Sequence, residues 1–167
     1  MASLREQGTS MDLLYRTGYR VAYRLLQVWW RIRAPQAHGA AVAAWDGERL
    51  LVVRTSYRPV FDLPGGGIER METALAAARR ELREETGVEA PADALVDAGT
   101  FRFEENRRSI TAQVFEWRPS GAVVPTADRR EIVWAGYLTE AELARAPLTT
   151  LLRLYLAAGG APVAETR

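Results

Sequence analysis

Three glutamates within one helical turn are the residues of this sequence best suited to chemistry. Glu81, Glu84 and Glu85 fall in the helix-forming segment Ala74–Thr86, and on a wheel of 100° per residue they lie within about 100° of one another. Like charges three and four residues apart repel, at a cost of about 0.2–0.5 kcal/mol per pair. A positive group should offset this repulsion. It is either Arg80, paired with Glu84 on a solvated helix face, or a bound cation.

Three consecutive glycines precede this helix and favour the cation. Gly65, Gly66 and Gly67 let the backbone approach a ligand or turn sharply, so their carbonyls and amides can join the carboxylates around a hard ion. A site of oxygen ligands alone is typical of Mg²⁺, with Mn²⁺ as an alternative. Such an ion leaves positions for water and phosphate oxygens, which predicts metal-assisted attack on a phosphoryl group.

The helix that positions the glutamates can be delimited from its end signals. Thr73 is a suitable N-cap, the residues from Ala74 onward are strong helix formers, and Gly87 falls where a left-handed residue ends a helix. On the wheel Leu75 and Leu82 form the stripe to be buried. We therefore predict a helix over residues 74–86 with the glutamates on the face beside this stripe.

The same stretch carries a longer pattern, GX5EX7REUXEEXGU with U aliphatic. Every defined position is matched, by Gly66, Glu72, Arg80, Glu81, Leu82, Glu84, Glu85, Gly87 and Val88. The chain therefore resembles the Nudix hydrolase family. The resemblance implies an α/β fold, an α/β/α sandwich with a mixed sheet, and Mg²⁺-dependent hydrolysis of a nucleoside diphosphate linked to another moiety, X.

The resemblance also implies roles for particular residues. The carbonyl of Gly66 and the carboxylates of Glu81, Glu84 and Glu85 hold the metal. Glu72 and Arg80 form a salt bridge that fixes the loop against the helix. An acidic residue before the last strand of the family, here Glu131, contributes a further metal ligand or the general base. The proton of the attacking water then passes to Glu81 or to Glu131.

Two arginines and the first glycines are candidate contacts for the substrate. Arg54 ends a predicted strand. Arg58 lies in the following stretch TSYRPVFDLPGGG, which is rich in breakers and is predicted to be one loop. Both arginines could reach phosphate oxygens beside the metal. Gly65 and Gly66 would contribute their backbone to the same site. The only histidine, His38, precedes the first strand and is interpreted as a surface residue.

Composition bounds the remaining possibilities. The 167 residues suggest one domain, and 48% hydrophobic with 26% charged residues is ordinary globular composition. Without cysteine, disulfides and thiolate metal sites are excluded, and the cytoplasm is the expected compartment. The basic residues are all arginine and nearly balance the acidic ones, leaving a net charge of +1. Nucleic-acid binding is therefore not expected.

Strand and helix signals follow one another along residues 39–160, which we assign to the catalytic domain. Alternating or apolar runs predict strands at 39–45, 48–55, 94–103, 110–117 and 131–138. Thr139 with Glu142 forms a capping box that starts a short helix. A last helix is predicted over residues 148–158, and residues 161–167 form a C-terminal tail.

Residues 1–38 form a basic extension of a different kind. They hold six arginines against Glu6 and Asp12, for a net charge of +4. Between Met11 and Arg33 arginines recur on one narrow face of a predicted amphipathic helix with a wide apolar arc opposite. Arginines at every turn exclude a signal peptide and a membrane span. The arc must be covered by its own domain, a lipid surface or a second subunit, and we predict a homodimer.

Three functions remain open at this stage. The first is a nucleotide or nucleotide-sugar pyrophosphatase acting on a small diphosphate. The second is a Nudix-like sensor that binds a nucleotide without cleaving it, although no ligand glutamate is lost here. The third is a lipid or prenyl diphosphate hydrolase at a membrane surface. The stretch GTFRFEENRR beyond the helix lacks the proline or tyrosine that marks family subgroups for ADP-ribose or dinucleoside polyphosphates.

Overall fold

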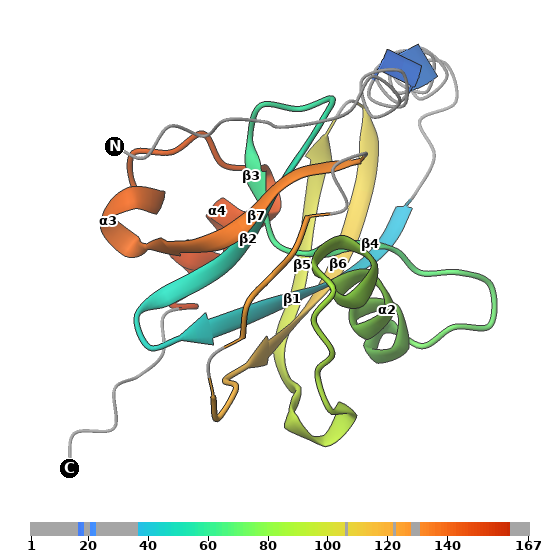
Figure 1. The fold of residues 1–167 in the computed structure, drawn as a ribbon. Helices are drawn as coiled ribbons and strands as arrows, with labels where there is room; N and C mark the ends of the chain where they lie inside the picture. The colour runs from blue at the N-terminus through green and yellow to red at the C-terminus, as the bar shows by residue number, and fades with distance from the viewer. Residues whose placement is uncertain are drawn as a thin grey trace.

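In the computed structural model the described residues are 17–18, 21–22, 37–105, 107–121, 123–127 and 131–160. Their strands are β1 (Ala37–Asp46), β2 (Arg49–Thr55), β3 (Phe61–Asp62), β4 (Gly65–Gly67), β5 (Val96–Glu105), β6 (Arg108–Trp117) and β7 (Ile132–Thr139). Their helices are α2 (Ala74–Thr86), the 3₁₀ turn η1 (Ala92–Ala94), α3 (Glu140–Leu143) and α4 (Thr150–Ala157). Figure 1 shows their arrangement.

Strand β1 is the central strand of the sheet and pairs with β2, β4 and β6. The strand order is β3-β2-β1-β6-β5, with β4 also paired to β1 and β7 also paired to β2. The pairing of β1 with β6 is parallel, whereas β1 with β2, β1 with β4 and β5 with β6 are antiparallel. The sheet is therefore mixed, as the family resemblance predicted.

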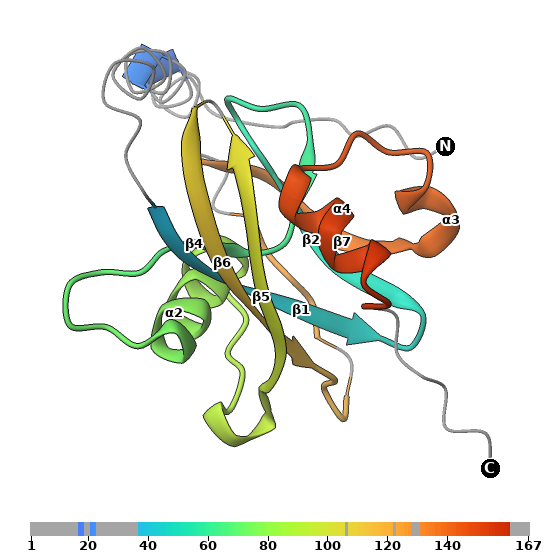
Figure 2. The ribbon, with the colours of Figure 1, turned by 180° about the vertical axis from the view of Figure 1, so that it is seen from behind.

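Alternation along β1 builds a core on each face of the sheet. Successive side chains of a strand point to opposite faces. Ala40, Val42 and Ala44 belong to a buried cluster with Leu82 of α2. The alternate residues of the strand pack with Leu152 and other residues of α3 and α4. Because the two helical layers lie on opposite sides of the sheet (Figures 1 and 2), the predicted α/β/α sandwich is confirmed.

Helix α2 begins and ends at the predicted residues. The hydroxyl of Thr73 accepts a hydrogen bond from the amide of Ala76 at 3.2 Å. Gly87 has φ of 68°, and its amide donates to the carbonyl of Arg83, which is the left-handed termination that glycine accepts without strain. The face that carries Leu82 is buried against the sheet, so the turn with the glutamates has a rigid support.

The structure corrects the prediction of one long loop before α2. Residues 61–62 pair with β2 as strand β3, and the glycines pair with β1 as strand β4. None of the three glycines has a positive φ. Breaker-rich composition predicts a loop, but here tertiary pairing with β1 overrides that preference. Strand β1 also begins earlier than predicted, so that His38 lies within it.

The N-terminal extension lies almost entirely outside the described residues. Of residues 1–36, only 17–18 and 21–22 are described, and they are helical, whereas residues 37–38 belong to β1. The amphipathic helix over 11–33 and its homodimer therefore stay predictions. In the described parts of the chain, no helix has the length and apolar character needed to cross a bilayer.

Candidate functional site

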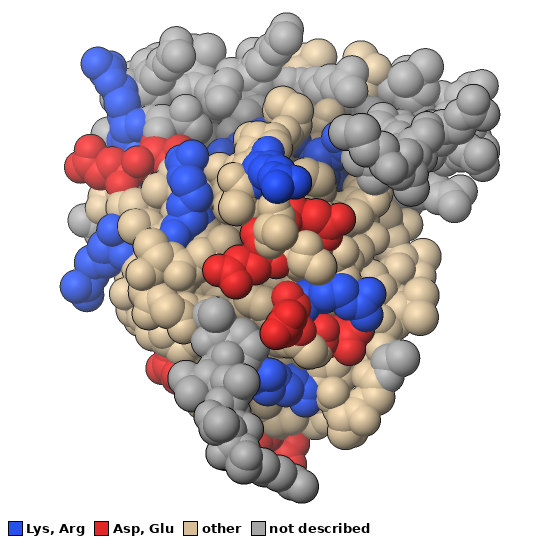
Figure 3. All heavy atoms as spheres, turned by 90° about the vertical axis from the view of Figure 1, so that its left-hand side faces the viewer, with Lys and Arg blue, Asp and Glu red and all other residues tan. Residues whose placement is uncertain are grey.

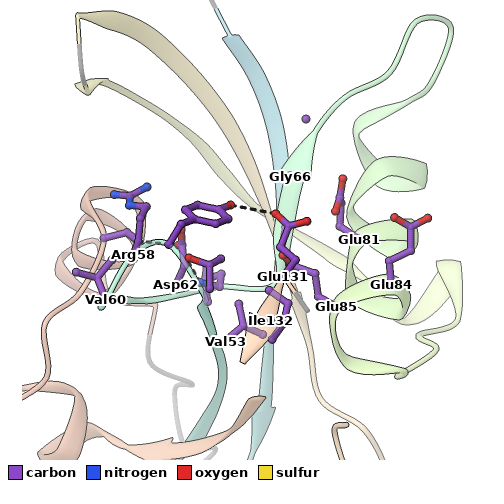
Figure 4. A pocket seen from close by; sticks show the side chains of 16 residues that line it. Val53, Arg58, Val60, Asp62, Gly66, Glu81, Glu84, Glu85, Glu131 and Ile132 are labelled. Atoms are coloured by element: carbon purple, nitrogen blue, oxygen red, sulfur yellow. Dashed lines mark hydrogen bonds between the residues drawn. The ribbon is translucent and has the colours of Figure 1, made fainter. Parts of the chain in front are cut away.

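A pocket of about 510 Å³ lies between α2 and the segment that connects β2 to β3. Figure 4 shows Glu81, Glu84 and Glu85 projecting from α2 on one side. Arg58 and Asp62 lie on the other side. Glu131 stands between the two groups at the start of β7. The backbone of β4 completes the wall, so the fold brings the four predicted carboxylates and the glycines to one cavity.

Arg80 ties the helix to the glycine strand. Its guanidinium donates to both oxygens of Glu72 at 3.0 Å, to Glu81 at 2.7 Å and to Glu84 at 3.4 Å. It also donates to the carbonyl of Gly67 at 3.0 Å. The predicted salt bridge between Glu72 and Arg80 is therefore present. The two partners of Arg80 on α2 differ in exposure. The side chain of Glu81 is 17% exposed, whereas that of Glu84 is 52% exposed.

Burial disfavours the charged form of two carboxyls on α2. It raises the pKa of Glu85 well above its ordinary value, and the nearby charges of Glu81 and Asp62 act in the same direction. The amide of Gly65 donates to the Glu85 carboxylate at 2.9 Å and opposes the shift. Burial also raises the pKa of Glu81, against the hydrogen bond from Arg80. A cation at this position would relieve the crowding of negative charge.

The absence of a side chain at Gly66 makes room for the Glu81 carboxylate. A Cβ atom at residue 66 would lie 2.5 Å from Oε1 of Glu81. At Gly65 a Cβ would instead meet backbone, since the carbonyl oxygen of Ala40 would be 2.6 Å away and Cα of Ala41 2.7 Å away. Gly65 is therefore required by sheet packing, whereas Gly66 is required by the acidic group beside it.

The donor set fits a hard divalent cation. The carboxylates of Glu81, Glu84, Glu85 and Glu131 line the cavity beside the glycine strand, and carboxylate oxygens are ligands that Mg²⁺ and Mn²⁺ prefer. Among the described residues, no three acidic or histidine side chains converge as a completed metal centre. Glu81 accepts a hydrogen bond from Arg80, and Glu85 accepts one from the Gly65 amide.

Glu131 is held from outside the helix. The amide of Ser56 donates to the backbone carbonyl of Glu131 at 2.7 Å. The hydroxyl of Tyr57 donates to its carboxylate at 3.0 Å, the dashed line in Figure 4. Both donors follow β2, which pairs with β7. The strand pairing thus brings Glu131 to the pocket across a long stretch of sequence.

The two predicted phosphate-binding arginines differ in their placement. Arg58 lines the pocket, and its guanidinium donates to both carboxylate oxygens of Glu105, at 2.8 and 3.3 Å. Arg54 lies on β2 opposite Phe61 and Trp134. It is absent from the residues that line the pocket in the described part of the chain.

Asp62 and Thr149, like Tyr57, line the pocket but were not singled out from the sequence. Asp62 accepts a hydrogen bond from the hydroxyl of Thr149 at 2.7 Å and another from the amide of Leu63 at 2.9 Å. Burial raises the pKa of Asp62 to about 6, although the contact with Thr149 and the charge of Arg58 act against this shift. In the sequence Asp62 was only a polar residue between two apolar ones, and its partner lies 87 residues away.

The charge on the outer surface is mixed. On the face shown in Figure 3, acidic side chains gather near the centre with arginines beside them. The pairs of Arg80 with Glu81 and of Arg58 with Glu105 are of this kind. The negative charge of the site is thus partly neutralised by arginines of the same chain.

Comparison with known proteins identifies the class. The model of the NUDIX domain matches residues 35–158, and the chain belongs to this family. A MutT-like protein of Streptomyces ambofaciens is 35% identical over 104 residues, which make up 60% of this chain and 64% of that relative. The match therefore spans less than two thirds of the relative's own length.

Solved structures agree on the fold. The NUDIX domain of Shewanella oneidensis NrtR, in complex with ADP-ribose, has a TM-score of 0.65 at 17% identity, over 75% of this chain and 86% of that one. A bifunctional NMN adenylyltransferase/ADP-ribose pyrophosphatase of Francisella tularensis, with AMP and a manganese ion, has a TM-score of 0.61 at 19% identity. That match covers 88% of this chain and 48% of the Francisella chain. At these identities the likeness concerns the fold alone.

Proposed function

We propose that this chain is a Mg²⁺-dependent Nudix hydrolase that cleaves the diphosphate linkage of a nucleoside diphosphate joined to another moiety, X. The observation that carries the proposal is the pocket itself, in which the carboxylates of α2 and Glu131 face one cavity beside the glycine strand. A cavity with several carboxylates on one side and an arginine on the other suits a divalent ion together with phosphate oxygens.

The residues that would hold the ion are Glu81, Glu84, Glu85, Glu131 and the carbonyl of Gly66. When bound, Mg²⁺ or Mn²⁺ neutralises phosphate charge and makes water a better nucleophile at neutral pH. Glu81 or Glu131 accepts the proton of the attacking water, since both carboxylates line the cavity. Arg58, which faces the same cavity, reaches the phosphates by exchanging its bond to Glu105 for a phosphate oxygen.

The nucleotide class of the substrate is supported by the solved relatives. The NUDIX domain of Shewanella oneidensis NrtR is complexed with ADP-ribose, and the bifunctional Francisella enzyme is complexed with AMP and a manganese ion. For this chain we propose a nucleotide or nucleotide-sugar diphosphate, with a lipid diphosphate as the less favoured class.

A panel of nucleoside diphosphate derivatives tests both the reaction and its class. Purified protein with Mg²⁺ should release phosphate-bearing products from at least one member, and chelation should abolish the release. Binding to members that are not cleaved is measured in parallel by calorimetry. Binding without cleavage of any member would replace the hydrolase with a nucleotide sensor.

We also propose that residues 11–33 join two copies of the chain. The support is the wide apolar arc of that segment in the sequence, which one small domain covers only in part. Light scattering of the full chain should give about twice 18.6 kDa, and deletion of residues 1–33 should abolish the dimer. A full-length mass near 18.6 kDa without detergent would contradict the dimer, and flotation with anionic vesicles would then test the lipid surface.

A further inference from the structure

The segment that connects β2 to β3 is fastened on both sides of Tyr57, beside the pocket. At its start Thr55 pairs with Ile132 at the first residue of β7, and the amide of Ser56 donates to the Glu131 carbonyl at 2.7 Å. At residue 58 the guanidinium holds Glu105, the last residue of β5, through two hydrogen bonds. Tyr57 lies between these two attachments, so its backbone is held on both sides.

The Tyr57 side chain reaches from this segment to the acidic group. Its hydroxyl donates to Oε1 of Glu131 at 3.0 Å, and both residues line the pocket. A hydrogen bond from a neutral donor to a carboxylate is stronger than one between neutral groups. The contact therefore orients the Glu131 carboxylate as well as stabilising its charge.

Glu131 needs such a donor because its neighbours repel it. Its charge raises the pKa of both Glu81 and Glu85, and the hydrogen bond from Tyr57 holds the Glu131 carboxylate against this repulsion. Glu81 accepts a hydrogen bond from the Arg80 guanidinium, and Glu85 accepts one from the Gly65 amide. The Tyr57 hydroxyl is the corresponding hydrogen-bond donor for the Glu131 carboxylate.

We propose that Tyr57 is a positioning residue, whose hydroxyl holds the Glu131 carboxylate toward the carboxylates of α2 and so sets both the affinity for the divalent ion and the turnover. The inference rests on the proposed function, because it assigns Glu131 to the ion. Groups that orient metal ligands in this way commonly change metal affinity or activity by about 10- to 100-fold when they are removed.

A double-mutant cycle tests the proposal. Tyr57→Phe, Glu131→Gln and the double variant are compared with the unmodified chain in two measurements: Mn²⁺ affinity without substrate, and kcat and KM with Mg²⁺ and the best substrate of the panel. We expect Tyr57→Phe to weaken Mn²⁺ binding about tenfold and to lower kcat by a similar factor, with KM within about twofold. The double variant should be no weaker than Glu131→Gln alone, since the hydroxyl acts only through that carboxylate.

Tyr137→Phe is the matched control. Tyr137 lies on β7, beneath the guanidinium of Arg49 and outside the residues that line the pocket in the described chain. Removal of its hydroxyl should leave Mn²⁺ affinity, kcat and KM unchanged. Thermal unfolding of every variant identifies any general loss of structure.

Two results would overturn the proposal. One is a Tyr57→Phe variant with unchanged Mn²⁺ affinity, and the other is a double variant whose losses in Mn²⁺ affinity multiply, because either means that the hydroxyl does not act through Glu131. If the unmodified chain cleaves no member of the panel, the proposed hydrolase is rejected. The Mn²⁺ cycle then decides on Tyr57 by itself, so the two failures are distinguishable.

Discussion

The two sides of the pocket are built in different ways. On the helix side, Arg80 bonds Glu84 four residues away and Glu72 eight residues away, and the Gly65 amide bonds a carboxylate 20 residues away. On the opposite side the partners are 47, 74 and 87 residues apart, in the contacts of Arg58, Tyr57 and Asp62. The helix side is thus a local construction, and the other side exists only once the sheet has formed.

This difference separates the tasks of the two sides. The helix side gathers carboxylates on a buried, capped helix, which gives a rigid acidic surface whatever the substrate. On the other side, Tyr57, Arg58 and Asp62 lie close together in the chain, but each bonds a partner from a different part of the fold. Substitutions on the helix side should therefore abolish turnover, whereas those opposite should modulate it.

The largest effect should come from the helix side. Glu81→Gln and Glu85→Gln, tested separately, should each lower kcat at least 100-fold, or about 2.7 kcal/mol of barrier, because they keep the shape and remove the charge. Steady-state assays with saturating Mg²⁺ measure the loss. Thermal unfolding with chelator should show no loss of stability, since burial already disfavours both charges. Near-normal rates would place the metal elsewhere.

A paired substitution on the glycine strand separates chemistry from folding. Gly66→Ala should lower kcat about 10- to 100-fold with little change in unfolding temperature, because its Cβ displaces only the end of the Glu81 side chain. Gly65→Ala should lower the unfolding temperature, because its Cβ meets the backbone of β1. If the two variants lost kcat and unfolding temperature to the same extent, Gly65 and Gly66 would not have these separate roles.

Glu131→Gln tests the one predicted ligand carboxylate that does not lie on α2. We expect kcat to fall about tenfold, or about 1.4 kcal/mol, less than for Glu81→Gln, because Glu131 assists a centre held mainly by α2. The steady-state assay with saturating Mg²⁺ compares this loss with that of Glu81→Gln. A loss equal to that of Glu81→Gln would identify Glu131 as the general base, and no loss would remove it from the site.

Asp62 should affect stability more than chemistry. Its pKa rises from 3.8 to about 6 in the folded chain, so the folded state binds this proton more tightly than the unfolded state. The protonated carboxyl therefore contributes to the free energy of unfolding, by about 3 kcal/mol at most. This contribution is complete below pH 4 and is lost as the pH rises through 6. Relative to Asp62→Asn, the unmodified chain should therefore lose stability between pH 4 and 7. Urea unfolding in chelator measures this difference.

Asp93→Asn provides the control for that measurement. Asp93 is an exposed carboxyl of η1 on the surface, and its variant should follow the unmodified chain at every pH. A constant difference between Asp62→Asn and the unmodified chain across this range would show that Asp62 does not titrate there.

The same contrast explains what could be predicted. Helix α2 and its caps are specified by residues close in sequence, and they were predicted from those residues. The salt bridge from Arg80 to Glu72 was predicted from the family resemblance. The mixed sandwich followed from the family resemblance. Asp62 was missed because its partner Thr149 is brought near only by the docking of α4, which no local pattern reports. The glycine strand was taken for a loop because its pairing depends on β1.

That glycine strand has a consequence for how the protein can diverge. Because β4 is hydrogen-bonded to the central strand of the sheet, its backbone cannot lengthen or shift without breaking the core. The segment between β2 and β3 is fastened mainly by side chains and one backbone contact, and it can take insertions or new residues while the sheet stays whole. A lineage derived from this chain would acquire new substrates through changes at residues 59–60, where Val60 lines the pocket, while keeping Tyr57, Arg58 and residues 65–67 unchanged.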